Sequence, residues 1–296
     1  MHGLITPLEP DRATERTAAS HGPGATQAVY ASPVRRLDAA VATSCGSYHR
    51  KNEDAHSSLA GRGRMFIVAD GVGGGAMAQL ASRLLVAHLH ETFAASTPDA
   101  DGIGAAVLAA DRVIADAIAR VTDKPGAATM VLGAPLDALA ATWLVAWVGD
   151  CRALRWSPRA PALLAALTRD DTFANLGEPV PAGGSGDDPA RMVGNGATLG
   201  ANVSIHALAC GEVLALCSDG VHKHLDGADW SRVLAAPLPL AQRARSLVAL
   251  ARSHGSVDDA TVLLLHRADP GWRGVRSSGG EPLDKASTAS NGRSEP

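Results

Sequence analysis

The segment MFIVADGVGGG, residues 65–75, decides how the fold is interpreted: an apolar run leads to Asp70, and a glycine-rich turn follows it. An apolar run of this length that ends in glycines favours a buried β-strand. Asp70 is therefore expected at the tip of a strand, at the rim of the core, where a lone negative charge is unfavourable. A single Asp-Gly pair after a strand is more often a simple turn. A functional role for Asp70 is therefore favoured only if acids occur at the ends of other apolar runs as well.

Acidic residues recur at the ends of other apolar runs, each beside a strand-like segment. They are Asp150 after LVAWV and Gly149, Asp219 after VLALC and Ser218, and Asp258 before the run TVLLL, with the pair Glu53-Asp54 besides. Several carboxylates at the rim of one hydrophobic core are best explained by a cation that they bind together, because it neutralises their charges. Carboxylates and water form the oxygen-only shell that suits Mg²⁺ or Mn²⁺.

Other site chemistries lack their motifs in this sequence. His222 and His224 are two residues apart, which does not place them on one helical face as a zinc site would need. No G-x-S-x-G elbow and no G-x-x-x-x-G-K-[ST] phosphate loop occurs. The run Gly71–Gly75 is not a nucleotide loop by itself, because Asp70 in front of it would repel a phosphate.

The chain organisation predicts one α+β domain. Strands are expected at 37–43, 65–69, 129–134, 138–148, 151–156, 213–217 and 261–265, and helices at 77–93, 103–121 and 240–253. Because strands and helices come in separate runs, antiparallel sheets covered by helices are favoured over alternating βαβ units. Residues 1–36 are expected to form a flexible arm, 37–268 the domain and 269–296 a disordered tail.

Composition excludes several classes of partner. The formal net charge is −3, which offers no basic field for nucleic acid or for an anionic membrane surface. No apolar stretch reaches the length of a membrane span. The four cysteines have no C-x-x-C spacing, so reduced structural thiols and a cytoplasmic location are expected.

Seven segments, in this order, resemble the metal-dependent serine/threonine protein phosphatases of the PPM type, the phosphatase 2C-like family, in its bacterial form. They cover almost the whole of the expected domain. They are Asn52–Ala55 (NEDA), Asp70–Gly74 (DGVGG), Gly149–Arg152 (GDCR), Leu167–Asp170 (LTRD), Asn195–Gly200 (NGATLG), Cys217–Gly220 (CSDG) and Asp258–Thr261 (DDAT).

The resemblance implies a four-layer α-β-β-α sandwich of two antiparallel sheets flanked by helices, with two Mn²⁺ or Mg²⁺ ions at one end. By position, Asp70, Asp219 and Asp258 would be the catalytic carboxylates, and Asp70 would bridge both ions. The other ligands implied are the Gly71 carbonyl, Glu53 or Asp54 for the second ion, and Asp150, which with Asp219 would hold a possible, weaker third ion.

Four departures from the family pattern bear on substrate binding. His49 replaces the usual arginine that grips the substrate phosphate, and Arg50 lies beside it, so either is expected to bind the phosphate. Val72 takes the position of the general-acid histidine of eukaryotic members. Asp259 replaces an asparagine and is expected to add negative charge to the site. The flap at 172–194 is short and without a clear helix, and its acids Asp187 and Asp188 are expected to be solvated.

Three functions remain open from the sequence. The first is a phosphoserine/phosphothreonine protein phosphatase, expected to be a monomer, whose partners would be phosphoprotein substrates and a cognate Ser/Thr kinase. The second is a weakly active or inactive phosphatase-like regulatory binding module, suggested by His49 and by the altered segment Ala128-Thr129-Met130. The third is a metal-dependent hydrolase of small phosphoesters.

Overall fold

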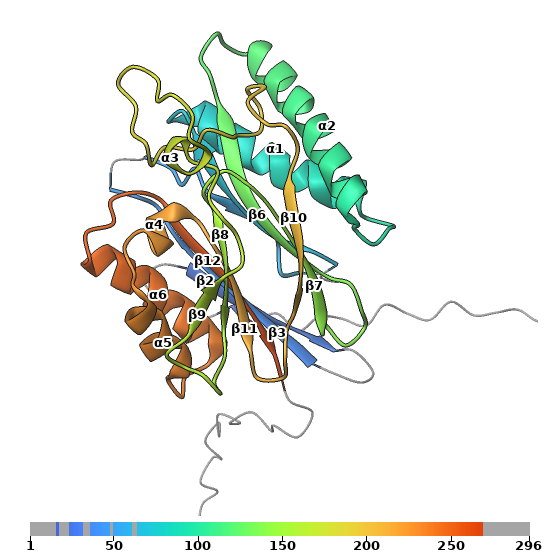
Figure 1. Ribbon diagram of the computed structural model, residues 1–296, viewed down its shortest axis with the longest axis vertical. Coiled ribbons are helices and arrows are strands. Elements are labelled where there is room, and N and C mark those ends of the chain that lie inside the picture. Colours follow the sequence, from blue (N-terminus) through green and yellow to red (C-terminus); the bar gives the residue numbers. More distant parts are fainter. Residues whose placement is uncertain (1–15, 18–23, 32–35, 48–49, 61–63, 269–296) are drawn as a thin grey trace, which may run out of the picture.

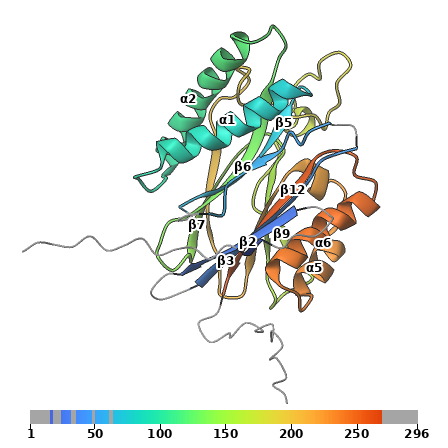
Figure 2. The same ribbon diagram turned by 180° about the vertical axis from the view of Figure 1, so that it is seen from behind.

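Four layers build the protein, in the order helices, sheet, sheet, helices (Figures 1 and 2). The computed structural model describes residues 16–17, 24–31, 36–47, 50–60 and 64–268. Helices α1 (Ala76–Thr92) and α2 (Ala100–Ala119) form one outer layer. Helices α4 (Asp219–His222), α5 (Gly227–Ala235) and α6 (Leu240–Ser253) form the other. The expected α-β-β-α sandwich is therefore confirmed.

Both sheets are built from antiparallel strand pairs. The five-stranded sheet has the order β10 (Asn202–Ala207), β7 (Thr142–Val148), β6 (Ala127–Pro135), β5 (Phe66–Val72), β4 (Ala55–His56). The seven-stranded sheet has the order β1 (Arg16–Thr17), β2 (Gly24–Ala31), β3 (Arg36–Ser44), β12 (Ala260–Arg267), β11 (Val213–Cys217), β8 (Arg152–Trp156), β9 (Leu164–Ala166).

The two sheets pack face to face, and this explains the continuous apolar runs in their strands. In β5, Phe66 and Val68 point into the core between the sheets, whereas Ile67 and Ala69 point to the core beneath α1 and α2. Successive side chains of a strand alternate between its two faces. Because both faces are covered here, both sets of side chains must be apolar, and the end of each strand becomes the first place where a charged group can sit.

Helices α5 and α6 cover the outer face of the seven-stranded sheet. Trp230 of α5 is 1% exposed, and Leu247 and Val248 of α6 are fully buried in the same core cluster. Asp226 caps α5, because its carboxylate accepts a hydrogen bond from the backbone N–H of Asp229 at 2.8 Å. This layer fixes the short helix α4, which follows β11 directly and reaches the end of the sandwich.

The structure corrects three expectations about elements. Strand β2 falls inside the expected flexible arm and pairs with β3 over its whole length, so that expectation is wrong for residues 24–31. Strand β7 begins at Thr142 rather than at residue 138, because the Asp137 carboxylate accepts hydrogen bonds from Leu139, Ala141 and Thr142 and holds a turn. The flap contains the short helix α3 (Phe173–Leu176).

The expected tail, 269–296, lies outside the described residues. Among the residues that the structure describes, no helix is both long enough and apolar enough to cross a membrane.

Candidate metal centre

A pocket of about 310 Å³ brings together acids from segments far apart in the sequence. Most of these acids lie at the end of a buried strand or next to it; Glu53 precedes the half-buried strand β4, and Asp188 belongs to the flap. The acids that line the pocket are Glu53, Asp70, Asp150, Asp188, Asp219 and Asp258. The structure therefore gathers the sequence-predicted carboxylates, except Asp54, on the walls of one cavity.

The connection from β5 to α1 forms one wall of this pocket, and its glycines have a conformational reason. Gly73, Gly74 and Gly75 all have positive φ, which glycine adopts without strain. Gly71 has no room for a side chain: a Cβ there would lie 2.4 Å from the Ala78 carbonyl oxygen. The glycines thus let the chain turn tightly from Asp70 into α1 and expose the backbone of Gly71–Gly74 to the pocket.

Asp70 is the electrostatic centre of the cluster. Burial of its carboxylate is the main cause that raises its pKa well above the usual range. The negative charges of Asp54, Asp219, Asp150 and Asp258, in that order, raise it further. A carboxylate in this environment favours a bound proton or a bound cation over the bare ionised form.

Asp54 lies behind the pocket wall. Its Oδ2 accepts a hydrogen bond from Ser218 Oγ at 2.8 Å, and burial raises the pKa of Asp54 to about 7. Its Oδ1 is buried with no hydrogen-bond partner, and the same is true of Asp219 Oδ1. Buried carboxylate oxygens without a donor are unfavourable, so both atoms have unused capacity for a cation.

Glu53 is anchored at three points on its backbone and side chain. Its Oε1 accepts a hydrogen bond from Gly75 N–H at 2.5 Å, and its carbonyl oxygen accepts one from Ser82 Oγ at 2.5 Å. Its own N–H donates to Asp259 Oδ2 at 2.6 Å. Asp259 thus faces the backbone and does not line the pocket, but its negative charge still raises the pKa of Asp54, as expected of an added acid near the site.

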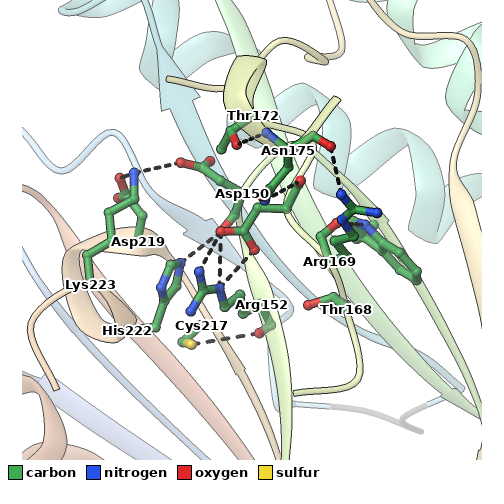
Figure 3. Close-up of polar contacts among 12 residues, drawn as sticks. Asp150, Arg152, Thr168, Arg169, Thr172, Asn175, Cys217, Asp219, His222 and Lys223 are labelled. Carbon is green, nitrogen blue, oxygen red and sulfur yellow. Dashed lines mark hydrogen bonds and ion pairs between the residues drawn. The ribbon is translucent and has the colours of Figure 1, made fainter. Parts of the chain in front are cut away.

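Lys223 lies between two of the predicted ligands (Figure 3). Its Nζ forms ion pairs with Asp150 Oδ2 and Asp219 Oδ2, each at 2.8 Å. Burial raises the pKa of Asp150 to about 6, with Asp219 adding to the shift and Lys223 opposing it. For Asp219 burial is the largest single cause and raises the pKa, but the charge and hydrogen bond of Lys223, together with smaller effects of Asp70 and His222, outweigh it, so the pKa is lowered.

A second set of polar contacts fixes the loop that carries Asp150. His222 of α4 forms a hydrogen bond through Nε2 with the Asp150 carbonyl oxygen at 2.8 Å. Arg152 donates to both oxygens of Asp170 at 2.7 to 3.1 Å, a bidentate pair. Asp171 Oδ2 accepts from Gly149 N–H at 3.1 Å. Sequence reasoning assigned no role to these residues, although Asp170 ends the matched LTRD segment and Asp171 follows it directly.

Only one of the two predicted phosphate-binding residues can be compared with the pocket. His49 lies outside the described residues, and Arg50 is exposed and not part of the pocket lining. Among the described residues, Lys223 is the only basic side chain that lines the pocket.

The flap contributes Asp188 and Pro189 to the pocket lining, and Asp188 is solvated there, as expected. Asp188 is exposed, and its Oδ2 accepts a hydrogen bond from Ser185 N–H at 2.7 Å. An ion pair between Arg191 and Glu178 joins the two sides of the flap.

The donor set fits a hard divalent cation in its chemistry: all donors are oxygens, two buried carboxylate oxygens lack partners, and the charges are concentrated around Asp70. The side chains are not yet gathered around one point. Within the described ranges, no group of three or more His, Cys, Asp or Glu side chains is arranged to hold a metal ion. Several carboxylates are instead engaged by Lys223, by Ser218 and by the backbone.

Comparison with solved structures gives the same architecture. The chain resembles the PPM Ser-Thr phosphatase MsPP from Mycobacterium smegmatis, solved in complex with cacodylate (27% identity, TM-score 0.64, covering 77% of this chain and 97% of that one). It also resembles the catalytic domain of the serine/threonine phosphatase PstP with two manganese ions (24% identity, TM-score 0.65, 79% and 99% covered). A third match is PppA, a regulatory component of T6SS in Pseudomonas aeruginosa (23% identity, TM-score 0.64, 78% and 97% covered).

No protein-family model and no curated protein sequence matches the chain. The chain has the fold of the PPM-type serine/threonine phosphatases, and the resemblance inferred from its motifs is confirmed at the level of the fold.

Proposed function

We propose that the protein is a metal-dependent phosphatase that hydrolyses phosphoserine and phosphothreonine in proteins. The observation that carries the proposal is the pocket that Asp70, Asp219 and Asp258 line together, although the three residues are separated by up to 188 positions. It lies in a fold shared with PPM-type phosphatases, of which one was solved with two manganese ions. Two Mn²⁺ or Mg²⁺ ions are proposed as the cofactors.

The residues have the following proposed roles. Asp70 would contact both ions, and Asp219 and Asp258 would hold one of them. The second ion would be held by Glu53 or Asp54 and by the Gly71 carbonyl. The ions, when bound, supply Lewis acidity and lower the pKa of a water nucleophile. Glu53 is positioned for its role by Asp259 and Gly75, and Asp54 by Ser218. His49 and Arg50 remain the proposed phosphate-binding side chains.

A hydrolysis assay with a matched variant tests this function. Purified protein should hydrolyse p-nitrophenyl phosphate and a phosphothreonine peptide when Mn²⁺ is added, and EDTA should stop both reactions. Asp219→Asn should lose the activity while its circular dichroism spectrum stays unchanged. Asp187→Asn, an exposed flap residue outside the pocket lining, should keep wild-type activity. Hydrolysis that is indifferent to EDTA would contradict the proposal.

A weakly active or inactive binding module is the second candidate function. It is favoured by Lys223, which already pairs with two of the predicted ligands, and by Arg50, which lies outside the pocket lining. In that case calorimetry would detect metal or phosphopeptide binding without turnover. The phosphopeptide assay, run beside sugar and nucleotide phosphates, also separates protein phosphatase activity from hydrolysis of small phosphoesters.

The cellular setting follows from the same proposal. No disulfide bond joins the four cysteines, all of which lie in described segments, and this fits a reducing cytoplasm. A monomer that acts on phosphoproteins and opposes a Ser/Thr kinase is the proposed working form.

A further inference from the structure

Lys223 occupies its place because of local helix geometry. Helix α4 begins at Asp219, and the Lys223 N–H continues the helical pattern with a hydrogen bond to the Asp219 carbonyl oxygen at 3.0 Å. Residues four apart lie on the same helical face, so the Lys223 side chain must run alongside Asp219. Its ammonium group then reaches Asp150 on the loop after β7 (Figure 3).

The two carboxylates that it joins need a counter-charge. The side chains of Asp150 and Asp219 are only 4% and 17% exposed, and they belong to a pocket with further acids. An ionised carboxylate removed from water requires an opposite charge close by. The ammonium group meets this need for both carboxylates at once, at 2.8 Å from each.

A divalent ion cannot share this position with the ammonium group. Mg²⁺ binds carboxylate oxygens at about 2.0–2.1 Å, which requires the space between the two Oδ2 atoms that Nζ fills. A nearby positive charge also repels an incoming cation in an environment of low dielectric constant. His222 holds the Asp150 backbone to the same helix, so the loop is fixed in the position that suits the ion pair.

We propose that Lys223 is a built-in cation that takes the place of a third metal ion between Asp150 and Asp219, so that the protein binds two divalent ions and not three. The inference rests on the proposed function, because it presupposes the two-ion centre around Asp70. It reassigns Asp150 from metal ligand to partner of Lys223. Asp219 keeps its Oδ1, which has no hydrogen-bond partner, for the two-ion centre.

Metal stoichiometry tests the inference without an activity measurement. Native mass spectrometry and calorimetry with Mn²⁺ should count two ions per wild-type chain. Lys223→Met removes the charge and keeps the length of the side chain, so it should bind a third, weaker ion. The double variant Lys223→Met/Asp150→Asn should return to two. Lys124→Met, which changes an exposed loop lysine, should also bind two.

The single variant Asp150→Asn provides a second test that does not depend on the folding of Lys223→Met. Because Asp150 is assigned to Lys223 and not to a metal, this variant should still bind two ions. Three ions in the wild type, or only two in a folded Lys223→Met protein, would overturn the inference and leave the proposed function standing. Failure of every form to bind Mn²⁺ would overturn both.

Discussion

Asp259 holds the backbone of Glu53 in place across 206 positions of sequence: its Oδ2 accepts the Glu53 N–H at 2.6 Å. Its other oxygen accepts the Gly46 N–H, also at 2.6 Å. Asp259 is 1% exposed, so both hydrogen bonds are shielded from water. One buried carboxylate therefore connects the start of β12 to both ends of the segment between β3 and β4, and it sets where Glu53 enters the pocket.

Asp259→Ala should destabilise the protein and weaken metal binding together. The substitution leaves two buried N–H groups without an acceptor, which lowers the free energy of unfolding by roughly 2–4 kcal/mol. Glu53 would lose its anchor, so the affinity for Mn²⁺ should fall as well. Urea denaturation and calorimetry measure the two effects.

The exposed Asp123 offers a matched control for this change. Asp123→Ala should alter the free energy of unfolding by less than about 0.5 kcal/mol. An Asp259→Ala protein with wild-type stability would show that the two hydrogen bonds do not hold the Glu53 loop.

Asp70→Asn should stabilise the metal-free protein. Burial and four neighbouring carboxylates disfavour the ionised form of Asp70, so a neutral amide removes an unfavourable charge. The expected gain in the free energy of unfolding is about 1–3 kcal/mol at pH 7.5 in EDTA. Thermal unfolding of wild type and variant in parallel measures it.

Addition of Mn²⁺ should reverse this order of stability. A ligand that binds only the folded state raises stability by an amount that grows with the logarithm of its affinity, and only the wild type keeps the central carboxylate. A variant that is less stable than the wild type in EDTA would show that Asp70 makes a favourable structural contribution without metal.

The elements that the sequence predicted well are a strand buried on both faces and helices with one buried apolar face. Strand β5 and helices α1 and α6 agree with their expected positions to within a few residues. Strand β10, by contrast, pairs only with β7 at a sheet edge, and Ile205 in it is 63% exposed. Its sequence, NVSIHA, alternates polar and apolar residues over only six positions, a signal too short to separate this strand from a loop. Strand β2 was not predicted, because its sequence GATQAVYA has no long apolar run.

The candidate site was predictable where acids follow buried strands, as at Asp70, Asp150 and Asp219. The role of Lys223 was not predicted, although its spacing from Asp219 is the i,i+4 spacing of a helical ion pair. Helix α4 has only four residues, too few to show a helical pattern in the sequence, so the i,i+4 spacing could not be interpreted as an ion pair. The orientation of Asp259 away from the pocket depends on the Gly46 and Glu53 loops, which sequence alone does not place.

His222 should make stability depend on acidic pH. Burial lowers the pKa of this histidine to about 4, whereas about 6.5 is usual in an unfolded chain. At this site the unfolded state therefore binds more protons between these values, so the contribution of His222 to stability falls by about 3 kcal/mol as the pH decreases from about 6.5 to about 4. The raised pKa values of Asp54, Asp70 and Asp150 act in the opposite direction over this range, so the contribution of His222 is measured as a difference between variant and wild type.

His222→Gln removes the titrating group and keeps an N–H that can reach the Asp150 carbonyl, so its stability relative to the wild type should increase as the pH falls over this range. Urea denaturation at pH 4.5 and 6.5 measures the difference. His254→Gln, at an exposed position, should keep the wild-type pH dependence. Equal pH dependence in the His222→Gln and wild-type proteins would argue against a buried neutral histidine.

Gly71→Ala should disturb the turn from β5 into α1. The new Cβ would lie 2.4 Å from the Ala78 carbonyl oxygen and 2.9 Å from that of Glu53, and both are backbone atoms that cannot move separately. A loss of about 1–3 kcal/mol in the free energy of unfolding is expected, with weaker Mn²⁺ binding. Gly104→Ala, in open space inside α2, should instead stabilise by about 0.5–1 kcal/mol.

The central claim is that acids from distant segments gather around divalent ions in one pocket. Crystals grown with Mn²⁺ and measured near the manganese absorption edge test it most directly. Two anomalous peaks are predicted in the pocket beside Asp70, with Asp219 and Asp258 at one of them and none between Asp150 and Asp219. A pocket without any manganese peak, in crystals soaked at millimolar Mn²⁺, would contradict the account.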